Sequence, residues 1–286
     1  MRAPRTDRTL AGGLMWCLVL SLAVRPTGSA QPPAKDEPPE EPKKLNEVIE
    51  KSIDWYDVFP DGDAKTPLAP LPVIRWRNVA RGQDGEAMMV VWCHNGRPVV
   101  MASIYPWQGK MTHEFDALAR SDKPVARDKD KAIWAPETVG IEFKEVPKAP
   151  RPAKTAPERL RQMKAVAESF KATMTGWRGD NADQEALRLL PRPLHRYDLA
   201  GAKEPDPKLL DGALFAYVQG TDPEVVLILE AVGTADKAEW QYAFVRATSG
   251  GLEVKLGNEV VWTAVKHPAN RNPKLPHFSM QRVLEK

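Results

Sequence analysis

The chain has 286 residues, of which 42% are hydrophobic and 28% are charged, with 27 prolines, 2 cysteines and a formal net charge of +3. This length and apolar content suffice for one large or two ordinary packed domains. They exclude wholesale disorder, a collagen-like repeat and a disulfide-stapled miniprotein.

Residues 1–30 have the pattern of a signal peptide. Three arginines precede an apolar stretch from Leu10 to Val24, and the small residues Gly28-Ser29-Ala30 follow it. The apolar stretch is shorter than the about 20 residues that a bilayer span needs. We therefore expect cleavage near Ala30, export to the periplasm or the extracellular space, and no transmembrane segment in the mature chain.

Removal of this leader changes the charge of the protein. The 41 basic and 38 acidic residues include four arginines and one aspartate in the leader, so 37 of each remain and the mature chain is neutral. A neutral exported chain lacks the basic footprint of a nucleic-acid-binding protein. Cys93 is the only cysteine left, so the mature chain has no internal disulfide.

Residues 31–71 read as a tether rich in proline and charge that contains one short helix. Residues 31–44 have five prolines and no large apolar side chain, which leaves too little apolar surface to offset the entropy of ordering. The helix is predicted from apolar residues at helical spacing, namely Leu45, Val48, Ile49, Ile53 and Tyr56.

Two segments, 72–146 and 193–264, carry similar patterns in the same order. Pro72-Val73-Ile74-Arg75-Trp76 matches Pro193-Leu194-His195-Arg196-Tyr197, and an Asp-Gly pair with two apolar runs follows in each. The apolar runs and short turns, Asn95-Gly96 among them, indicate antiparallel meanders. The predicted fold class is α+β, mainly antiparallel β, with two related β-meander units (an internal duplication) bridged by an amphipathic helix.

The connector, residues 147–192, contains this bridging helix. Thr155 and Glu158 form a capping box, and the apolar spacing predicts a helix of about 20 residues that ends at Gly176. Because the Val225–Leu229 run is continuously apolar, we expect its strand to be covered on both faces. The tail, residues 265–286, is interrupted by prolines and is expected to be irregular.

Several short sequence segments resemble those of a family of exported bacterial proteins with no assigned activity. The similarity extends from Val73 to about Trp262 and implies no reaction and no catalytic residues. It is carried by Arg75-Trp76-Arg77-Asn78, Tyr105-Pro106-Trp107, Leu187-Arg188-Leu189-Leu190-Pro191, Asp211-Gly212-Ala213-Leu214-Phe215 and Gln219-Gly220-Thr221-Asp222-Pro223.

Candidate catalytic and metal-ligating residues are few. Cys93 and His94 are neighbours, but adjacent side chains of a strand point to opposite faces, so His94 cannot act as the base for Cys93. His94, His113 and Glu114 have ligand chemistry, but no short two-ligand spacing occurs. We therefore expect no catalytic residues, no metal and no cofactor.

Tryptophan is the enriched residue type, and its flat ring can stack on a sugar. Trp107 has no aromatic counterpart in the second unit, which makes it the candidate surface anchor. We expect an exported non-catalytic binding or interaction protein, with a protein or carbohydrate ligand between the two units, and with Trp107, His94, His113 and Glu114 as the ligand-binding residues. The alternative is a hydrolase-like enzyme at the same interface that uses His94, His113 and Glu114.

Overall fold

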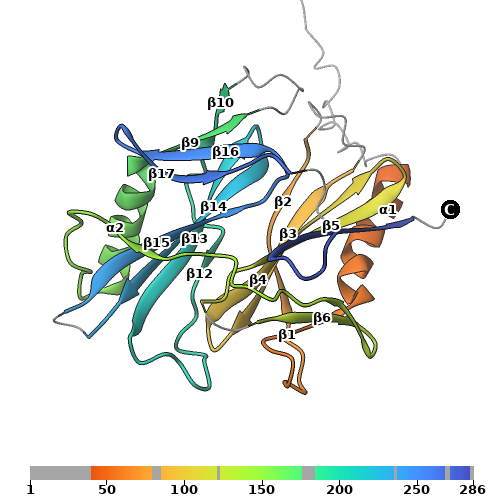
Figure 1. Ribbon diagram of the computed structural model, residues 1–286, viewed down its shortest axis with the longest axis horizontal. Helices are drawn as coiled ribbons and strands as arrows, with labels where there is room; N and C mark the ends of the chain where they lie inside the picture. The colour runs from red at the N-terminus through yellow and green to blue at the C-terminus, as the bar shows by residue number, and fades with distance from the viewer. Residues whose placement is uncertain are drawn as a thin grey trace, which may run out of the picture. The chain divides into compact units, whose positions relative to one another are not determined.

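The computed structural model describes residues 40–78, 85–120, 123–175, 184–234, 237–267 and 271–283. The predicted leader and the first part of the tether lie outside these ranges. No helix within them is long and apolar enough to cross a membrane. The described part of the chain is mostly antiparallel β-sheet with two short α-helices, which confirms the predicted class in its coarse form (Figure 1).

The first large sheet has five antiparallel strands in the order β2-β3-β4-β5-β18. Asn95 and Gly96 both have positive φ and form the tight turn between β3 and β4, as the sequence predicts. The strand bounds are β2 Pro70–Trp76, β3 Ala87–His94, β4 Arg97–Trp107, β5 Lys110–Ala117 and β18 His277–Val283.

The second large sheet has six strands, with β11, β13, β14, β15 and β8 side by side and β12 also paired with β13. All its strand pairs are antiparallel, and the long β13–β14 hairpin forms its centre. The strand bounds are β8 Lys144–Glu145, β11 Arg188–Leu189, β12 His195–Arg196, β13 Leu209–Gln219, β14 Asp222–Val232 and β15 Glu239–Arg246.

A helix and a smaller sheet accompany each large sheet. The first group consists of α1 Glu40–Ser52, the 3₁₀ turn Ile53–Trp55, β1 Asp57–Phe59, β6 Val125–Asp128 and β7 Lys131–Trp134, with sheet order β1-β6-β7. The second consists of α2 Ala156–Ser169, β9 Phe170–Thr175, β10 Gln184–Ala186, β16 Gly251–Leu256 and β17 Glu259–Ala264, with sheet order β10-β9-β16-β17.

The central strands are buried on both faces, which explains their continuous apolar runs. On β3, Met88 and Val90 contact the core beneath α1, while Met89 and Val91 point to the second sheet. On β14, Leu227 belongs to the core beneath α2, and its neighbours belong to the core between the sheets. Coverage of the Val225–Leu229 strand on both faces is thereby confirmed.

The core between the two large sheets makes them pack face to face. It consists of buried apolar side chains from both sheets, with methionine and valine on one side and leucine, isoleucine and valine on the other. The main contributors are Ala87, Met89, Val91 and Met101 from the first sheet, and Leu214, Val226, Ile228, Ala243 and Val245 from the second.

The connector helix is shorter than predicted. The helix α2 ends at Ser169, and β9 begins at Phe170 with side chains that alternate between more buried and less buried positions. Thr173 and Thr175 favour an extended chain, and pairing with β16 satisfies the backbone. Phe170 and Met174 fit both the helical and the strand period, so spacing alone could not separate the two.

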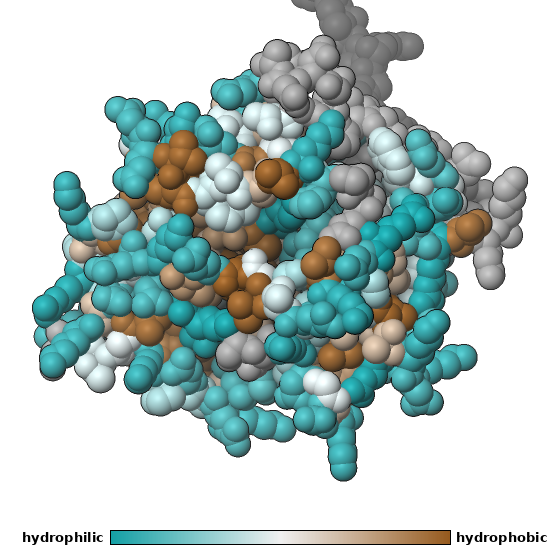
Figure 2. All heavy atoms as spheres, viewed as in Figure 1, coloured by the Kyte–Doolittle hydropathy of each residue, from teal (hydrophilic) through white to brown (hydrophobic). Residues whose placement is uncertain are grey.

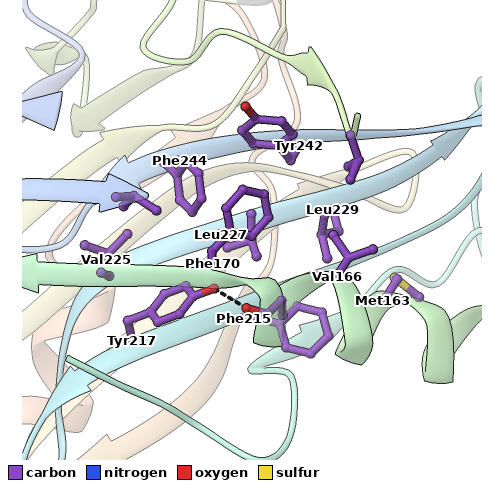
Figure 3. Packing of buried hydrophobic residues seen from close by; sticks show 14 of the residues in the cluster. Met163, Val166, Phe170, Phe215, Tyr217, Val225, Leu227, Leu229, Tyr242 and Phe244 are labelled. Atoms are coloured by element: carbon purple, nitrogen blue, oxygen red, sulfur yellow. Dashed lines mark hydrogen bonds between the residues drawn. The ribbon is translucent and has the colours of Figure 1, made fainter. Parts of the chain in front are cut away.

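The helix α2 packs on the outer face of the second large sheet (Figure 3). Met163 and Val166 face a core that includes Phe215 and Leu229, and the Tyr217 hydroxyl donates a hydrogen bond of 2.6 Å to the carbonyl of Ala167. That α2 bridges the two units stays a prediction.

The C-terminal tail is not irregular as expected, because His277–Val283 forms β18 at the edge of the first sheet. Its partner, β5, would otherwise be an exposed edge strand with unpaired backbone groups. The two large sheets therefore exchange edge strands. The short β8 follows the first meander in sequence but pairs with β15, whereas β18 follows the second meander and pairs with β5.

A buried carboxylate links the two large sheets. Glu230 on β14 is 0% exposed and accepts hydrogen bonds from Arg97 (Nε to Oε1, 3.0 Å) and Arg120 (Nη2 to Oε2, 2.6 Å) of the first half. The Tyr197 hydroxyl donates a further bond of 3.0 Å. These charge-assisted bonds satisfy a group that could not otherwise remain buried.

Replacement of Glu230 by glutamine tests this linkage. It removes the charge that two arginines share, so we expect a loss of about 3 kcal/mol in the free energy of unfolding, measured by urea denaturation. The matched control is Glu168→Gln on the exposed face of α2, for which we expect a change within about 0.5 kcal/mol. Equal stabilities of the two variants would contradict a structural role for Glu230.

Candidate functional site

A cavity of about 200 Å³ lies between the two large sheets, at the end of β4 and the beginning of β14. The Glu230 linkage lies near the other ends of the same two strands. The cavity lining is polar and aromatic, and it comes from both halves of the fold: Trp76, Ser103, Tyr105, Trp107, Thr112, Glu114, Ser279 and Gln281 from the first sheet, and Asp222, Glu224, Ala247, Thr248 and Ser249 from the second half.

Strand alternation builds the first wall. On β4, Ser103, Tyr105 and Trp107 share the face that carries Met101 toward the second sheet. Ser103 lies opposite Glu114 on β5, which in turn lies opposite Ser279 on β18. A polar row therefore crosses three adjacent strands.

The opposite wall comes from the first residues of strand β14 and from the segment that follows β15. The side-chain amide of Asn78 donates a hydrogen bond of 3.2 Å to the carboxylate of Asp222. The backbone N–H of Ala247 donates to the carbonyl of Glu224 over 2.9 Å. The guanidinium of Arg246 donates to the carbonyls of Thr248 and Gly250, which holds the segment at the cavity wall.

The carboxyl group of Glu114 is biased toward its neutral form. Burial is the main cause of its raised pKa, and the negative charges of Asp116 and Asp222 act in the same direction. The positive charge of His277 and a hydrogen bond with Tyr105 act in the opposite direction. The cavity lining thus combines the carboxyl group of Glu114, which is biased toward its protonated form, with the carboxyl groups of Asp222 and Glu224.

Asp116, two residues after Glu114 on β5, has a buried partner in His277 on β18. The Nδ1 atom of His277 lies 2.9 Å from Oδ1 of Asp116. Burial disfavours the charged imidazole, but Asp116, through its charge and its hydrogen bond, and the charge of Glu114 together raise the pKa of His277. Burial raises the pKa of Asp116, whereas His277 and the charge of Arg246 act in the opposite direction.

Two polar atoms in the cavity wall have no hydrogen-bond partner among the residues that the structure describes: Nε1 of Trp76 and Oγ of Ser103. Trp76 is 5% exposed and Ser103 is 3% exposed. A buried polar atom without a partner costs about 1–3 kcal/mol, so it requires an explanation.

Of the four predicted ligand residues, the structure brings Trp107 and Glu114 together in the cavity lining. Trp107 is half-buried and precedes the tight turn Gln108-Gly109 between β4 and β5. His113 and His94 do not join them. His113 points to the opposite face of β5, and His94 lies at the β3–β4 turn, near the other end of β4.

His113 is part of the packing beneath α1. It is 0% exposed, the Tyr56 hydroxyl lies 2.8 Å from its Nδ1, and the Trp55 ring centroid lies 5.1 Å from its own. Burial, followed by the positive charge of Arg282, lowers the pKa of His113 to about 3. The imidazole is therefore neutral at any ordinary pH.

Cys93 has a histidine neighbour that sequence reasoning did not pair with it. Its Sγ lies 3.6 Å from Nε2 of His195 on β12. Burial raises the pKa of the Cys93 thiol to about 11 and lowers the pKa of His195. The pair is therefore a neutral thiol beside a neutral imidazole, not an activated nucleophile.

The sequence interpretation missed the cavity-lining positions of Ser103, Tyr105, Asp222, Glu224 and Trp76. Glu224 is fully buried, whereas glutamate is mostly exposed in proteins, so its residue type gave no signal for this position. Within the described ranges, no group of three or more histidine, cysteine, aspartate or glutamate side chains is arranged to hold a metal ion.

Figure 2 shows the hydropathy of one face of the molecule. Hydrophilic side chains predominate there, and hydrophobic residues form small separate groups. The exposed large hydrophobic side chains of the described ranges come from separate elements: Leu71, Val139, Val260, Val265, Leu275 and Val283. Scattered exposed apolar residues are ordinary on a protein surface.

Comparison of this chain with models of protein families, with curated proteins and with solved structures gives no match.

The lowered pKa of His113 predicts loss of stability in mild acid. The unfolded chain binds a proton near pH 6.5 while the folded protein does not, so this contribution is present above pH 6.5 and is lost as the pH falls toward 3. At pH 5 the loss is about 2 kcal/mol. Between pH 7 and pH 5, we expect the free energy of unfolding to fall by about 2 kcal/mol less in His113→Gln than in the wild type, measured by urea denaturation at each pH.

The exposed His267 supplies the matched control for this experiment, as His267→Gln. A wild-type pH dependence retained in His113→Gln would contradict a neutral buried imidazole.

Proposed function

We propose that this protein is a non-catalytic binding protein whose ligand site is the cavity between the two large sheets. The observation that carries the proposal is a polar cavity at one end of a sheet–sheet interface whose middle is apolar. The middle of that interface is filled by Met89, Val226 and other apolar side chains, whereas the cavity retains hydroxyl, carboxyl and indole groups. Convergent polar groups in a concave site are typical of small-molecule recognition.

The lining from both halves supports a binding role. Ser103 and Glu114 come from the first sheet, and Asp222 and Glu224 come from the second. A ligand in this position contacts both sheets at once, so its binding energy adds to the stability of their packing.

Hydrolysis in the same cavity is the second candidate function. His94 and His113 do not support it, because neither lines the cavity. The raised pKa of Glu114 beside Asp222 does favour it, because a protonated carboxyl next to a second carboxylate is a general acid–base arrangement. Recovery of a bound ligand unchanged after prolonged incubation would exclude this second candidate.

We also propose that the two halves are related by duplication. The order β2-β3-β4-β5 in the first sheet corresponds to β12-β13-β14-β15 in the second. In each half, a helix is followed by a strand that pairs with a later hairpin. In the first half, α1 is followed by β1, which pairs with β6 of the β6–β7 hairpin. In the second half, α2 is followed by β9, which pairs with β16 of the β16–β17 hairpin. This shared succession supports the similarity of residues 72–146 to residues 193–264.

A thermal-shift screen tests the binding site. The probes are sugars, polyols, amino acids, alkylamines and short carboxylic acids, each added to the wild type and to two variants. Ser249→Tyr places a ring at the half-buried rim of the cavity, and Thr263→Tyr on the exposed face of β17 is its control. A ligand at one hundred times its dissociation constant raises the melting temperature by about 5–10 °C.

We expect this shift in the wild type and in Thr263→Tyr, and its loss in Ser249→Tyr. The proposed site is wrong if every probe shifts all three proteins equally or shifts none of them.

Export after cleavage near Ala30 is proposed from the leader pattern, and the resemblance to exported bacterial proteins supports it. N-terminal sequencing of the protein from the exported fraction of a bacterial host is expected to begin at Gln31. Leu14→Arg together with Leu18→Arg interrupts the apolar stretch and is expected to keep the protein in the cytoplasm. An exported protein that retains Met1 would contradict cleavage.

A further inference from the structure

We propose that the cavity between the sheets binds an uncharged, hydroxyl-rich ring of monosaccharide size, with the Trp76 indole N–H and the Ser103 hydroxyl as two of its hydrogen-bond partners. This inference rests on the proposed function and names the class of its ligand.

The first argument is the demand for an acceptor. An indole N–H can only donate a hydrogen bond, and that of Trp76 has no acceptor among the described residues. The hydroxyl of Ser103, 3% exposed on the same inter-sheet face, also lacks a partner among them. A ligand oxygen satisfies both groups. An alkylammonium group has donors only, so it leaves the indole unsatisfied.

The second argument is the mixture of donors and acceptors in the wall. The carboxylates of Asp222 and Glu224 accept hydrogen bonds, the hydroxyls of Thr112 and Ser279 donate or accept, and the indole donates. A ligand hydroxyl can donate to a carboxylate and accept from an indole at the same time. A ring with several hydroxyls therefore matches this wall better than a ligand with one kind of polar group.

The third argument concerns charge. Cationic groups already accompany the carboxyl groups, because His277 pairs with Asp116 and the charge of Arg246 acts on the same aspartate. Burial and neighbouring carboxylates also raise the pKa of Glu114, which favours its neutral, hydrogen-bond-donating form. Both features reduce the negative charge that a cationic ligand would otherwise have to neutralise.

The fourth argument is size and shape. A volume of about 200 Å³ is below the about 300–1,000 Å³ of sites for drug-sized ligands, so the cavity suits a single ring. The half-buried Trp107 in its lining supplies the aromatic surface, on which the C–H face of a sugar ring can stack.

The test is a titration of the full chain with defined probes, followed by saturation-transfer NMR. The hydroxylated probes are glucose, galactose, N-acetylglucosamine and myo-inositol. The charged probes are n-propylammonium chloride and sodium propionate. We expect saturable transfer to at least one hydroxylated ring and none to the charged probes.

Three variants locate the binding. Trp107→Leu removes the aromatic surface and is expected to weaken sugar binding about tenfold. Trp76→Phe keeps a ring but removes the N–H, and Ser103→Ala removes the hydroxyl, so each is expected to weaken binding about three- to tenfold. Trp55→Leu, half-buried on the opposite side of the first sheet, and Ser169→Ala on α2 are controls that should bind as the wild type does.

The outcomes separate the two proposals. Binding of n-propylammonium or propionate in place of the hydroxylated rings, with the same sensitivity to Trp107→Leu, overturns the ligand class and leaves the proposed site intact. Sugar binding that Ser103→Ala and Trp76→Phe leave unchanged also overturns this inference. If no probe of either kind distinguishes the cavity variants from their controls, both the inference and the proposed function fail.

Discussion

Glu230 lies with no exposed surface in the interface between the two large sheets, where Arg97 and Arg120 of the first half hold its carboxylate. This linkage fixes one end of an interface whose middle is apolar. An ionised carboxylate remains buried only if opposite charges and hydrogen bonds compensate for lost hydration. The two sheets must therefore meet in one relative position for the three side chains to reach one another. The rest of the fold, including the cavity, depends on that position.

The cavity lies near the opposite ends of the same two strands, β4 and β14, and the contrast between the two ends is informative. At one end the carboxylate of Glu230 receives bonds from two guanidinium groups and the Tyr197 hydroxyl. At the other end, Trp76 and Ser103 retain polar atoms without a partner among the described residues. Protein interiors seldom tolerate such atoms. The interface therefore has a fully bonded ionic linkage at one end and a polar cavity at the other.

The spacing of apolar residues correctly predicted elements that local sequence determines. It failed where the same spacing fits both a helix and a strand. The spacing of Leu45 and Ile49 correctly predicted a helix, although α1 begins at Glu40, inside the segment expected to stay unordered. Asn95-Gly96 correctly predicted a tight hairpin turn. Phe170 and Met174 suit a helix or a strand equally well, and pairing with β16 decides for the strand. The expectation of an irregular tail was wrong because β18 is stabilised by a partner, β5, that lies far away in sequence. For the candidate site, alternation along a strand already implied that His113 and Glu114 point to opposite faces, but the sequence did not show which face bears the cavity.

The sequence by itself determined the antiparallel β class and the burial of the central strands on both faces, because each follows from residue types and spacing within one segment. Only the tertiary structure decided that Asp222 and Glu224 lie across a cavity from Ser103, that Cys93 lies beside His195, and that β8 and β18 exchange sheets. These contacts join residues that are more than ninety positions apart. Packing between distant segments determines them, and local pattern carries no information about it.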